Sequence, residues 1–436
     1  MRYFSTNNRG TLVNLKTAVT TGMPEDGGLY MPEKIPEIPL QLLSQFQHMS
    51  IRDIAKIVLQ PFIYDELNQS EFEEIIDEAL SFDTPLISIT DQIFLLELFH
   101  GPTLAFKDVG ARFMSRLLSK LIQNDKREIN IVVATSGDTG SAVASGFFNV
   151  EGIRVFILYP SKKISDIQKK QITTYGHNIY PLEIGGNFDD CQRMVKQLLR
   201  DSEINKKIRI TTANSINIAR LLPQIVYYFK AVSQLQKDEK PYVCVPSGNF
   251  GNLCAGIIAK EMGLGIYKFV AATNVNDIVP EYLMTGIYQP KPSKRTLSNA
   301  MDVGDPSNFE RILSIYHNEY KKIKSAIIGA AYTDVQTRMK IKEVFQKHHY
   351  LLDPHGAVGF LALEETLKKD HRYPNVKGIT LETAHPTKFK VDMENIIEQS
   401  LVPPQRLKKR LQLKEHFERL PNQYDKVREY FIDICT

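Results

Sequence analysis

One lysine at the start of a predicted helix is the side chain of this sequence best placed for covalent chemistry. Lys107 follows Phe106 in the segment HGPTLAFKD (100–108), and apolar residues recur after it at spacings of three and four. A helix N-terminus disfavours a cation and burial removes its hydration, so both effects lower the pKa of a lysine amine. Such an amine is nucleophilic and can form a Schiff base. The same pattern also fits a lysine that reaches solvent beside an Asp108 that only complements the helix dipole.

Two glycine-flanked turns each join a predicted strand to a predicted helix. The first is ATSGDTGS (134–141) and the second is VPSGNFGN (245–252). Main-chain N–H groups in such turns can hold an anion. The second turn has neither the lysine of a nucleotide P-loop nor the GxGxxG spacing of a dinucleotide site, so a phosphate that is held but not transferred fits it best. For each turn, a tight bend with a capped helix is the alternative, and Asp138 is a good cap residue.

Two further segments are weaker candidates for ligand contact. ETAHPTKF (382–389) follows a predicted strand and offers the hydroxyl of Thr383 at the strand's carboxyl end. NSINIAR (214–220) opens a helix and places Asn217 and Arg220 one turn apart, which suits an anion. A helix cap and a surface charge explain the second segment equally well.

The elements that must position these residues form two different patterns. Residues 1–40 are rich in turn-forming Gly, Pro and Asp, and residues 41–82 have helical periodicity. After residue 85, short β-branched runs alternate with helical stretches, which is typical of a parallel, doubly wound α/β sheet. The predicted strands are 93–98, 129–134, 155–159, 179–184, 242–245, 269–273 and 378–381. The predicted helices include 107–122, 139–148, 165–176, 188–201, 216–236, 252–263, 308–323 and 334–347. Ligands of such sheets bind beyond the carboxyl ends of the strands, where the candidate residues lie.

Composition excludes several classes of protein. The 436 residues are 43% hydrophobic and 24% charged, which is ordinary globular composition with enough length for a large core. A net charge of +4 gives no basis for a nucleic-acid or membrane-surface partner. The four cysteines form no metal-binding cluster, so no metal and no disulfide framework are expected. The first residues lack the apolar core of a signal peptide, and we therefore expect a cytoplasmic protein.

Taken together, the segments HGPTLAFKDVGARF, ATSGDTGSAV, NSINIARLLPQ, VPSGNFGN and ETAHPTKF resemble those of the threonine synthase family, in its shorter bacterial and fungal form. The segment TGMPEDGGLYMPEKIP resembles that family's opening. The resemblance implies the pyridoxal-phosphate fold type II, similar to tryptophan synthase β, with two doubly wound α/β domains and a small, mostly helical N-terminal domain. The expected boundaries are 1–85 for the N-terminal domain, 86–112 with 226–400 for the large cofactor-binding domain, 113–225 for the small domain and 401–436 for a C-terminal helical extension.

The resemblance also implies a role for each motif. Lys107 would form the Schiff base with pyridoxal 5'-phosphate and move protons. The residues expected to hold the cofactor are Lys107, Gly248, Asn249, Phe250, Gly251 and Asn252, with Thr383 at the pyridine nitrogen. Those expected to face the substrate carboxylate are Ser136, Gly137, Asp138 and Thr139. Arg220, with Asn217 and Ser215, is our hypothesis for the leaving phosphate, since a planar guanidinium suits a phosphate.

The implied reaction converts O-phospho-L-homoserine and water into L-threonine and phosphate by γ-elimination and β-addition of water, the last step of threonine biosynthesis. We expect a small-molecule substrate only and a monomer or weak dimer. Many relatives of this fold have Asn where this chain has Asp138, which leaves the partner of Asp138 open. A serine/threonine dehydratase usually has its lysine in an SFKxRGA context, whereas this chain reads AFKDVGA. A relative that binds the cofactor without turnover is the other alternative, although every motif position is filled here.

Overall fold

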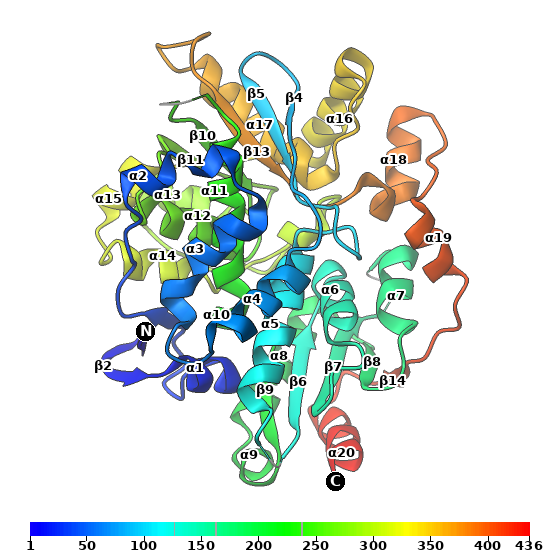
Figure 1. Cartoon of the computed structure of the whole chain (residues 1–436). Helices are drawn as coiled ribbons and strands as arrows, with labels where there is room; N and C mark the ends of the chain where they lie inside the picture. The colour runs from blue at the N-terminus through cyan, green and yellow to red at the C-terminus, as the bar shows by residue number, and fades with distance from the viewer. Residues whose placement is uncertain (126, 162–163, 237–238) are drawn as a thin grey trace.

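The computed structural model describes residues 1–125, 127–161, 164–236 and 239–436. Its strands form a six-stranded sheet in the order β12-β11-β10-β13-β5-β4, a five-stranded sheet in the order β14-β8-β7-β6-β9 and a three-stranded sheet in the order β2-β1-β3. Figure 1 shows the six-stranded sheet in the upper half of the molecule and the five-stranded sheet in the lower half. Among the described residues, no helix is both long enough and apolar enough to cross a membrane.

The six-stranded sheet is parallel except for the hairpin of its first two strands. Its strands are β4 (Leu86–Ser88), β5 (Ile93–Glu97), β10 (Tyr242–Pro246), β11 (Lys268–Thr273), β12 (Ile327–Ala331) and β13 (Gly378–Glu382). The helices of this part of the chain are α11 (Ile225–Ser233), α12 (Gly251–Glu261), α13 (Ile278–Thr285), η3 (Asn299–Met301), α14 (Phe309–Ile315), α15 (Tyr320–Ala326), α16 (Asp334–His348), α17 (Pro354–Lys368), η4 (Pro386–Phe389) and α18 (Lys390–Ile397). Its central strands β10 and β13 are buried along their whole length, as parallel strands covered on both faces must be.

The five-stranded sheet is parallel throughout. Its strands are β6 (Ile129–Ala134), β7 (Ile153–Pro160), β8 (Ile179–Ile184), β9 (Arg209–Thr212) and β14 (Glu418–Leu420). The helices along this stretch are α5 (Lys107–Ile122), α6 (Asp138–Phe147), α7 (Asp166–Thr173), α8 (Phe188–Arg200), α9 (Ser202–Lys207), α10 (Ile218–Leu221) and η2 (Leu222–Gln224). The two sheets therefore have separate sets of strands, and α5 leads the chain from the first sheet to the second.

The N-terminal region is less purely helical than its sequence indicates. The turn-rich first 40 residues form the antiparallel strands β1 (Tyr3–Ser5), β2 (Asn8–Val13) and β3 (Tyr30–Pro32), with α1 (Leu15–Thr21) between them. The helices α2 (Leu40–Leu43), η1 (Phe46–His48), α3 (Ile51–Ile63) and α4 (Gln69–Ala79) follow, as predicted. Both α3 and α4 begin with a capping box, from Ser50 and Asn68, which satisfies main-chain donors at each helix start.

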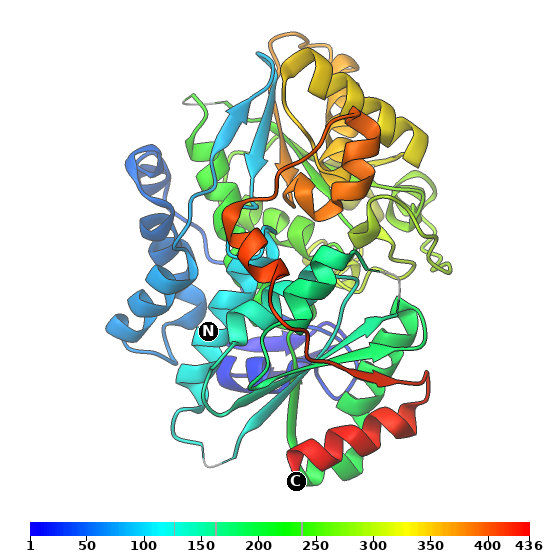
Figure 2. The ribbon, with the colours of Figure 1, turned by 90° about the vertical axis from the view of Figure 1, so that its right-hand side faces the viewer.

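The C-terminal segment was expected to be helical, and this prediction is incomplete. It contains α19 (Gln405–Leu411) and α20 (Tyr424–Cys435), but β14 between them pairs with β8 and completes the five-stranded sheet. Figure 2 shows this segment, orange to red, running from the upper half of the molecule to the lower half. Val427 and Phe431 of α20 are fully buried there, and the Phe431 ring lies 4.7 Å from that of Phe156.

All seven predicted strands are present, and α5 has the predicted bounds. The predicted helix 308–323 is wrong, because His317 and Asn318 have left-handed backbone angles that separate α14 from α15. Strands β9 and β12 and helix α17 are absent from the prediction. The sequence of β12, IIGAA, is short and rich in small residues, so its strand pattern is weak.

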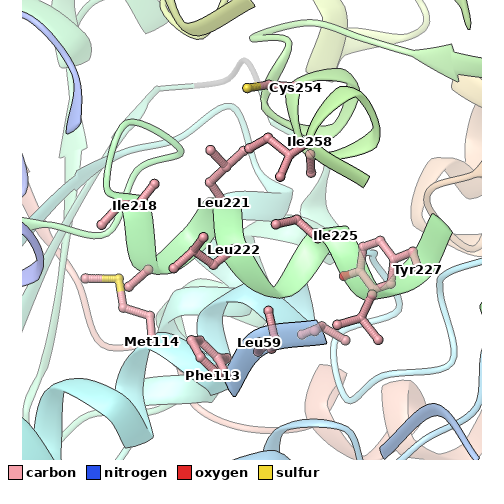
Figure 3. Close-up of a cluster of buried hydrophobic side chains, with 14 of the residues drawn as sticks. Leu59, Phe113, Met114, Ile218, Leu221, Leu222, Ile225, Tyr227, Cys254 and Ile258 are labelled. Atoms are coloured by element: carbon pink, nitrogen blue, oxygen red, sulfur yellow. The ribbon is translucent and has the colours of Figure 1, made fainter. Parts of the chain in front are cut away.

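A buried apolar cluster holds helix α5 in place (Figure 3). Its labelled residues are Leu59, Phe113, Met114, Ile218, Leu221, Leu222, Ile225, Tyr227, Cys254 and Ile258, each no more than 1% exposed. They come from α3, α5, α10, η2, α11 and α12, so the N-terminal region and both sheets share one core. The Tyr227 hydroxyl donates a 2.6 Å hydrogen bond to the main-chain oxygen of Phe106, the residue before Lys107.

Truncation of this cluster should therefore cost substantial stability. We expect Leu222→Ala to lower the free energy of unfolding by about 2–5 kcal/mol, through lost burial and an unfilled cavity. Urea denaturation checks this value, with Leu40→Ala as the matched control. Because Leu40 is 76% exposed, its truncation should change stability by less than about 0.5 kcal/mol, and equal effects of the two substitutions would contradict the prediction.

Candidate active site

Lys107 is brought to Thr383 by a short antiparallel contact between two distant segments. Leu104 has a left-handed backbone angle, φ 64°, and Ala105 forms a β-bridge with Ala384. On either side of that bridge, the Phe106 N–H donates to the Thr383 oxygen at 2.9 Å and the His385 N–H donates to the Leu104 oxygen at 3.0 Å. Lys107 then begins α5 directly after the bridge. The lysine and the carboxyl end of β13 therefore belong to one rigid unit.

The Lys107 amine lies in a largely buried, charge-balanced position. Its Nζ lies 3.9 Å from Asp138 Oδ2 and 4.7 Å from the centre of the Phe106 ring. Burial lowers the pKa of Lys107 below its usual value, and the positive charges of Lys388 and Arg220 act in the same direction against the opposing charge of Asp138. A lysine in this position can be an uncharged nucleophile near neutral pH.

The partner of Asp138 is Lys388, which sequence reasoning missed although it lies within a quoted motif. Lys388 is fully buried, and its Nζ donates to Asp138 Oδ1 at 2.8 Å and to the Thr103 oxygen at 2.9 Å. Gln168 donates to the same Asp138 oxygen at 2.9 Å. Burial alone would raise the pKa of Asp138, but the charges of Lys388 and Lys107 hold it well below its usual value. Asp138 is therefore an ionised acceptor, and it makes no capping bond to α6.

Around Asp138, the turn that follows β6 offers two free hydroxyl groups. Ser136 and Thr139 line the cavity, and neither side chain has a hydrogen-bond partner among the described residues. The turn requires glycine at position 137, between these two residues, because its φ is +135° and a Cβ atom there would lie 2.3 Å from the Gln168 amide carbon. Gly137 is not among the residues that line the cavity, and its contact with a ligand stays a prediction.

A second turn, after β10, forms an anion cradle at the start of α12. Phe250 has a left-handed backbone angle, φ 60°, and its side chain does not cap the helix. Gly251 and Asn252 line the cavity and their N–H groups have no hydrogen-bond partner among the described residues, whereas the Leu253 N–H donates to Asn252 Oδ1 at 3.0 Å. The loop is packed from behind, because a Cβ atom at Gly248 would lie 2.2 Å from the oxygen of Ala300. This geometry suits a phosphate held by main-chain donors.

Ser215 connects this cradle to the neighbouring segment. Its hydroxyl accepts hydrogen bonds from Asn249 at 2.7 Å and from Asn308 at 3.1 Å. Behind it, the fully buried Arg311 donates to the oxygens of Ser215, Ile216 and Tyr30, and thus ties the N-terminal region to the site. No local sequence pattern marks Arg311, because all these partners are distant along the chain.

Arg220 and Asn217, which were both predicted to hold a phosphate, have different surroundings in the structure. Arg220 lines the cavity, its Nε has no hydrogen-bond partner, and no salt bridge to it is found in the described part of the chain. Burial lowers its pKa to about 10. Asn217 is placed outside the site, contrary to the prediction, because its amide donates to the Val19 and Thr212 oxygens and its oxygen accepts from the Ala219 N–H. It caps α10, which is the alternative that its spacing left open.

All the predicted site residues except Gly137 and Asn217 line one cavity between the two sheets. His355 also lines it and was missed, although Asp353-Pro354 before it is a typical helix start that could have located α17. The Thr383 hydroxyl faces the same space and has no partner among the residues described. A wider cavity of about 660 Å³ shares Gln192, Lys196 and Val303 with this one.

The chain is similar in sequence and in structure to known proteins. Residues 80–379 match the family described as pyridoxal-phosphate dependent enzyme, residues 2–80 the threonine synthase N terminus and residues 356–431 the threonine synthase C-terminal family. A threonine synthase of Buchnera aphidicola subsp. Baizongia pistaciae is 39% identical over 99% of this chain and 100% of its own length. The crystal structure of threonine synthase from Escherichia coli superposes with a TM-score of 0.93, at 39% identity and full coverage of both chains. That of PLP-bound threonine synthase from Brucella melitensis has a TM-score of 0.92, at 35% identity and coverage of 99% and 98%.

Because Asp138 and Lys388 are both buried, removing the positive charge of Lys388 should greatly reduce the stability of the protein. We expect Lys388→Met to lower the free energy of unfolding by about 3–5 kcal/mol, because the buried Asp138 charge loses its closest partner. Urea denaturation measures the loss, and Lys342→Met is the control. Since the Lys342 side chain is 45% exposed, water and salt screen its 2.7 Å pair with Glu398, and its loss should change stability far less than that of Lys388. A small effect at Lys388 would mean that Asp138 is not held as an ionised group.

Proposed function

The chain belongs to the threonine synthase family of pyridoxal-phosphate-dependent enzymes, and on that premise we propose how its own residues divide the work of the reaction. That reaction converts O-phospho-L-homoserine and water into L-threonine and phosphate. It requires proton transfer at three carbon atoms, departure of a phosphate and addition of water in a site otherwise kept dry. The observation that carries the proposal is the position of the buried Lys107 amine, in one cavity with the anion cradle of α12.

The residues of the cavity fit pyridoxal phosphate. Lys107 offers an amine of lowered pKa to an aldehyde, and the uncapped N-terminus of α12, with residues 248–252, offers main-chain donors to a phosphate. Thr383 offers its free hydroxyl to the ring nitrogen. When bound, the cofactor supplies an electron sink for negative charge at the substrate's Cα. A hydroxyl at the ring nitrogen does not enforce a positive charge there as a carboxylate would.

Lys107 moves the protons. Its amine takes the Cα proton, gives that proton up, and then takes a Cβ proton, which expels the γ-phosphate as the Cγ–O bond breaks. A proton is returned to Cγ, the hydroxide part of water adds to Cβ while the remaining proton of water goes to the released phosphate, and a proton is returned to Cα. Each transfer needs an amine that both gains and loses a proton readily, and the lowered pKa of Lys107 supports that role. The ionised Asp138, 3.9 Å away, stabilises the protonated form between transfers.

Arg220 and Ser215 are proposed to hold the phosphate of the substrate. Arg220 is buried, lines the cavity and has an unpaired Nε, which are the properties of a guanidinium reserved for an anion. The hydroxyls of Ser136 and Thr139 are proposed to receive the substrate carboxylate. Asp138, which can only accept hydrogen bonds, orients Lys107 and does not bind the carboxylate.

We also propose the domain boundaries, the cellular compartment and the oligomeric state of the protein. We infer an N-terminal domain over 1–85, a large domain over 86–112 and 226–400, and a small domain over 113–225 to which part of 401–436 adds β14. Cys244, Cys254 and Cys435 form no disulfide bond, which supports a reducing compartment such as the cytoplasm. We propose activity as a monomer or weak dimer.

Replacing Lys107 tests the central role. We expect Lys107→Ala to lower phosphate release and threonine formation together by at least about a hundredfold, because the covalent attachment and the base are lost at once. Phosphate release from O-phospho-L-homoserine, with threonine measured by chromatography, checks this result. The control is Lys120→Ala on the same helix, whose side chain is 28% exposed and paired with Glu74. Deamination of serine or threonine by the wild type, without threonine formation, would contradict the proposed reaction.

Arg220 provides a separate test of phosphate recognition. We expect Arg220→Ala to lower kcat/KM by about 10- to 100-fold, which corresponds to a lost charged hydrogen bond, while the affinity for pyridoxal phosphate changes little. Steady-state kinetics and cofactor titration separate the two effects. Arg338→Ala, at an exposed surface pair with Asp392, is the matched control. Unchanged KM and kcat in Arg220→Ala would overturn this assignment.

A further inference from the structure

Behind the cavity wall lie two adjacent carboxyl groups with no role in the mechanism above. Glu382 is the last residue of β13, immediately before Thr383, and Asp353 caps α17, which carries His355. Both side chains are 0% exposed. The Asp353 N–H donates to Glu382 Oε1 at 2.5 Å, whereas Glu382 Oε2 has no partner. A Cβ atom at Gly356 would lie 1.5 Å from Oε2, so that glycine makes room for the carboxyl group.

The two carboxyl groups have different surroundings. Asp353 accepts from the His355 N–H at 2.8 Å, from His355 Nδ1 at 2.5 Å and from the Ala384 N–H at 3.3 Å. The Asp353 carboxyl group therefore accepts hydrogen bonds from three donors. Glu382 receives a single main-chain donor and therefore has far less to compensate a charge. Because two buried carboxylates in contact repel each other, the proton belongs on Glu382.

No cation pairs with Glu382 among the residues described. The residue that pairs with Glu382 on the neighbouring strand β5 is Glu97. The hydroxyl of Tyr350, in the segment before α17, donates a hydrogen bond to Glu97 at 2.7 Å. The titratable residues of β10, on the other side, are Tyr242 and Cys244. The nearby basic groups are engaged elsewhere: His355 with Asp353, His100 with Glu97, His385 with Thr387 and Lys107 beside Asp138. Burial first, and then the charge of Asp353, raise the pKa of Glu382 well above its usual value.

A chain of contacts links these carboxyl groups to the anion cradle. His355 Nε2 accepts a 3.2 Å hydrogen bond from the Ala300 N–H, so that nitrogen carries no proton and Nδ1 donates to Asp353. Ala300 in turn packs on Gly248, where even a Cβ atom would collide with its oxygen. The position of the cradle therefore depends on the tautomer of His355, and that tautomer depends on the charge of Asp353.

We propose that Asp353 and Glu382 hold one proton between them as a singly charged pair, and that this pair positions His355 and Ala300 behind the Gly248 loop. Both residues are positioning residues, since neither lines the cavity. The protonation of the pair does not depend on the roles proposed for Lys107 or Arg220. Its consequence for cofactor binding rests on the function proposed for the α12 cradle.

The protonation is tested by urea unfolding of wild type and Glu382→Gln as holoenzymes, from about pH 6 to about pH 9. Folded wild type retains a proton that the unfolded chain releases above about pH 4.3, so its stability falls as the pH rises. Glutamine has no proton to lose. The ratio of the wild-type to the variant unfolding constant should therefore rise about tenfold per pH unit until Glu382 ionises in the folded state.

The control substitution is Glu183→Gln, at a carboxylate that is also buried but is paired with Lys169 at 2.6 Å. Glu183 is ionised in both states over this range, because its paired charges lower its pKa, so its ratio should not change with pH. A ratio for Glu382→Gln that is equally flat would overturn the shared proton. That result would leave the phosphate-release test of Lys107 unaffected.

The positioning role is tested by titrating pyridoxal phosphate into Asp353→Asn. Loss of the charge should release His355 and raise the cofactor dissociation constant at least about tenfold. The control is Asp392→Asn, at the exposed pair with Arg338. Should Asp353→Asn fail to fold, His355→Asn takes its place, with the same expected shift. An unchanged dissociation constant in the folded variant would overturn the positioning role, while loss of activity alone would not support it.

Discussion

Asp138 and Lys388 form a buried ion pair at the wall of the cavity, and a pair of this kind persists only where both partners are firmly held. Asp138 begins α6, after a strand of the five-stranded sheet, and Lys388 lies in η4, after a strand of the six-stranded sheet. The pair therefore connects the two sheets across the cavity. Because Lys107 lies within reach of the same carboxylate, the separation of the sheets and the basicity of the amine are set by one interaction.

Charge is distributed unequally around the cavity. On one side, Asp138 is surrounded by Lys388, Lys107 and Gln168, which keep it ionised. Behind the cavity wall, Asp353 and Glu382 lie together with no cation paired to Glu382 among the described residues, and a proton replaces the missing positive charge. Arg220 has no acidic partner in the described part of the chain, and its Nε makes no hydrogen bond. The negative charge of Asp138 is thus balanced by cations, and the negative charge of Glu382 is removed by a proton. The positive charge of Arg220 has no acidic partner among the described residues. These differences follow from the hydrogen-bonding and charged groups that surround each side chain.

The features that depend on local sequence pattern could be predicted from the sequence. The bounds of α5, the two glycine turns and the seven strands follow from periodicity and turn chemistry, and the family resemblance identified most of the cavity lining. Lys388 and Arg311 were missed, because most of their partners lie on other segments and no spacing records those contacts. His355 was missed together with α17, although its partner Asp353 lies only two residues away. Asn217 was assigned wrongly because a helix cap and an anion ligand have the same sequence pattern. The strand β14 has only three residues and two exposed side chains, so nothing local distinguishes it from a loop.

The strand β14 also determines the order in which the protein can fold during synthesis. Four strands of the five-stranded sheet are made before residue 213, yet the fifth follows every strand of the six-stranded sheet along the chain. A ribosome therefore completes the large sheet while the smaller one still presents an unpaired β8 edge and the apolar groove that Val427 and Phe431 later fill. Such an open edge is a template for pairing with other chains. The nascent protein thus carries an open, aggregation-prone edge from the synthesis of β8 until β14 is made.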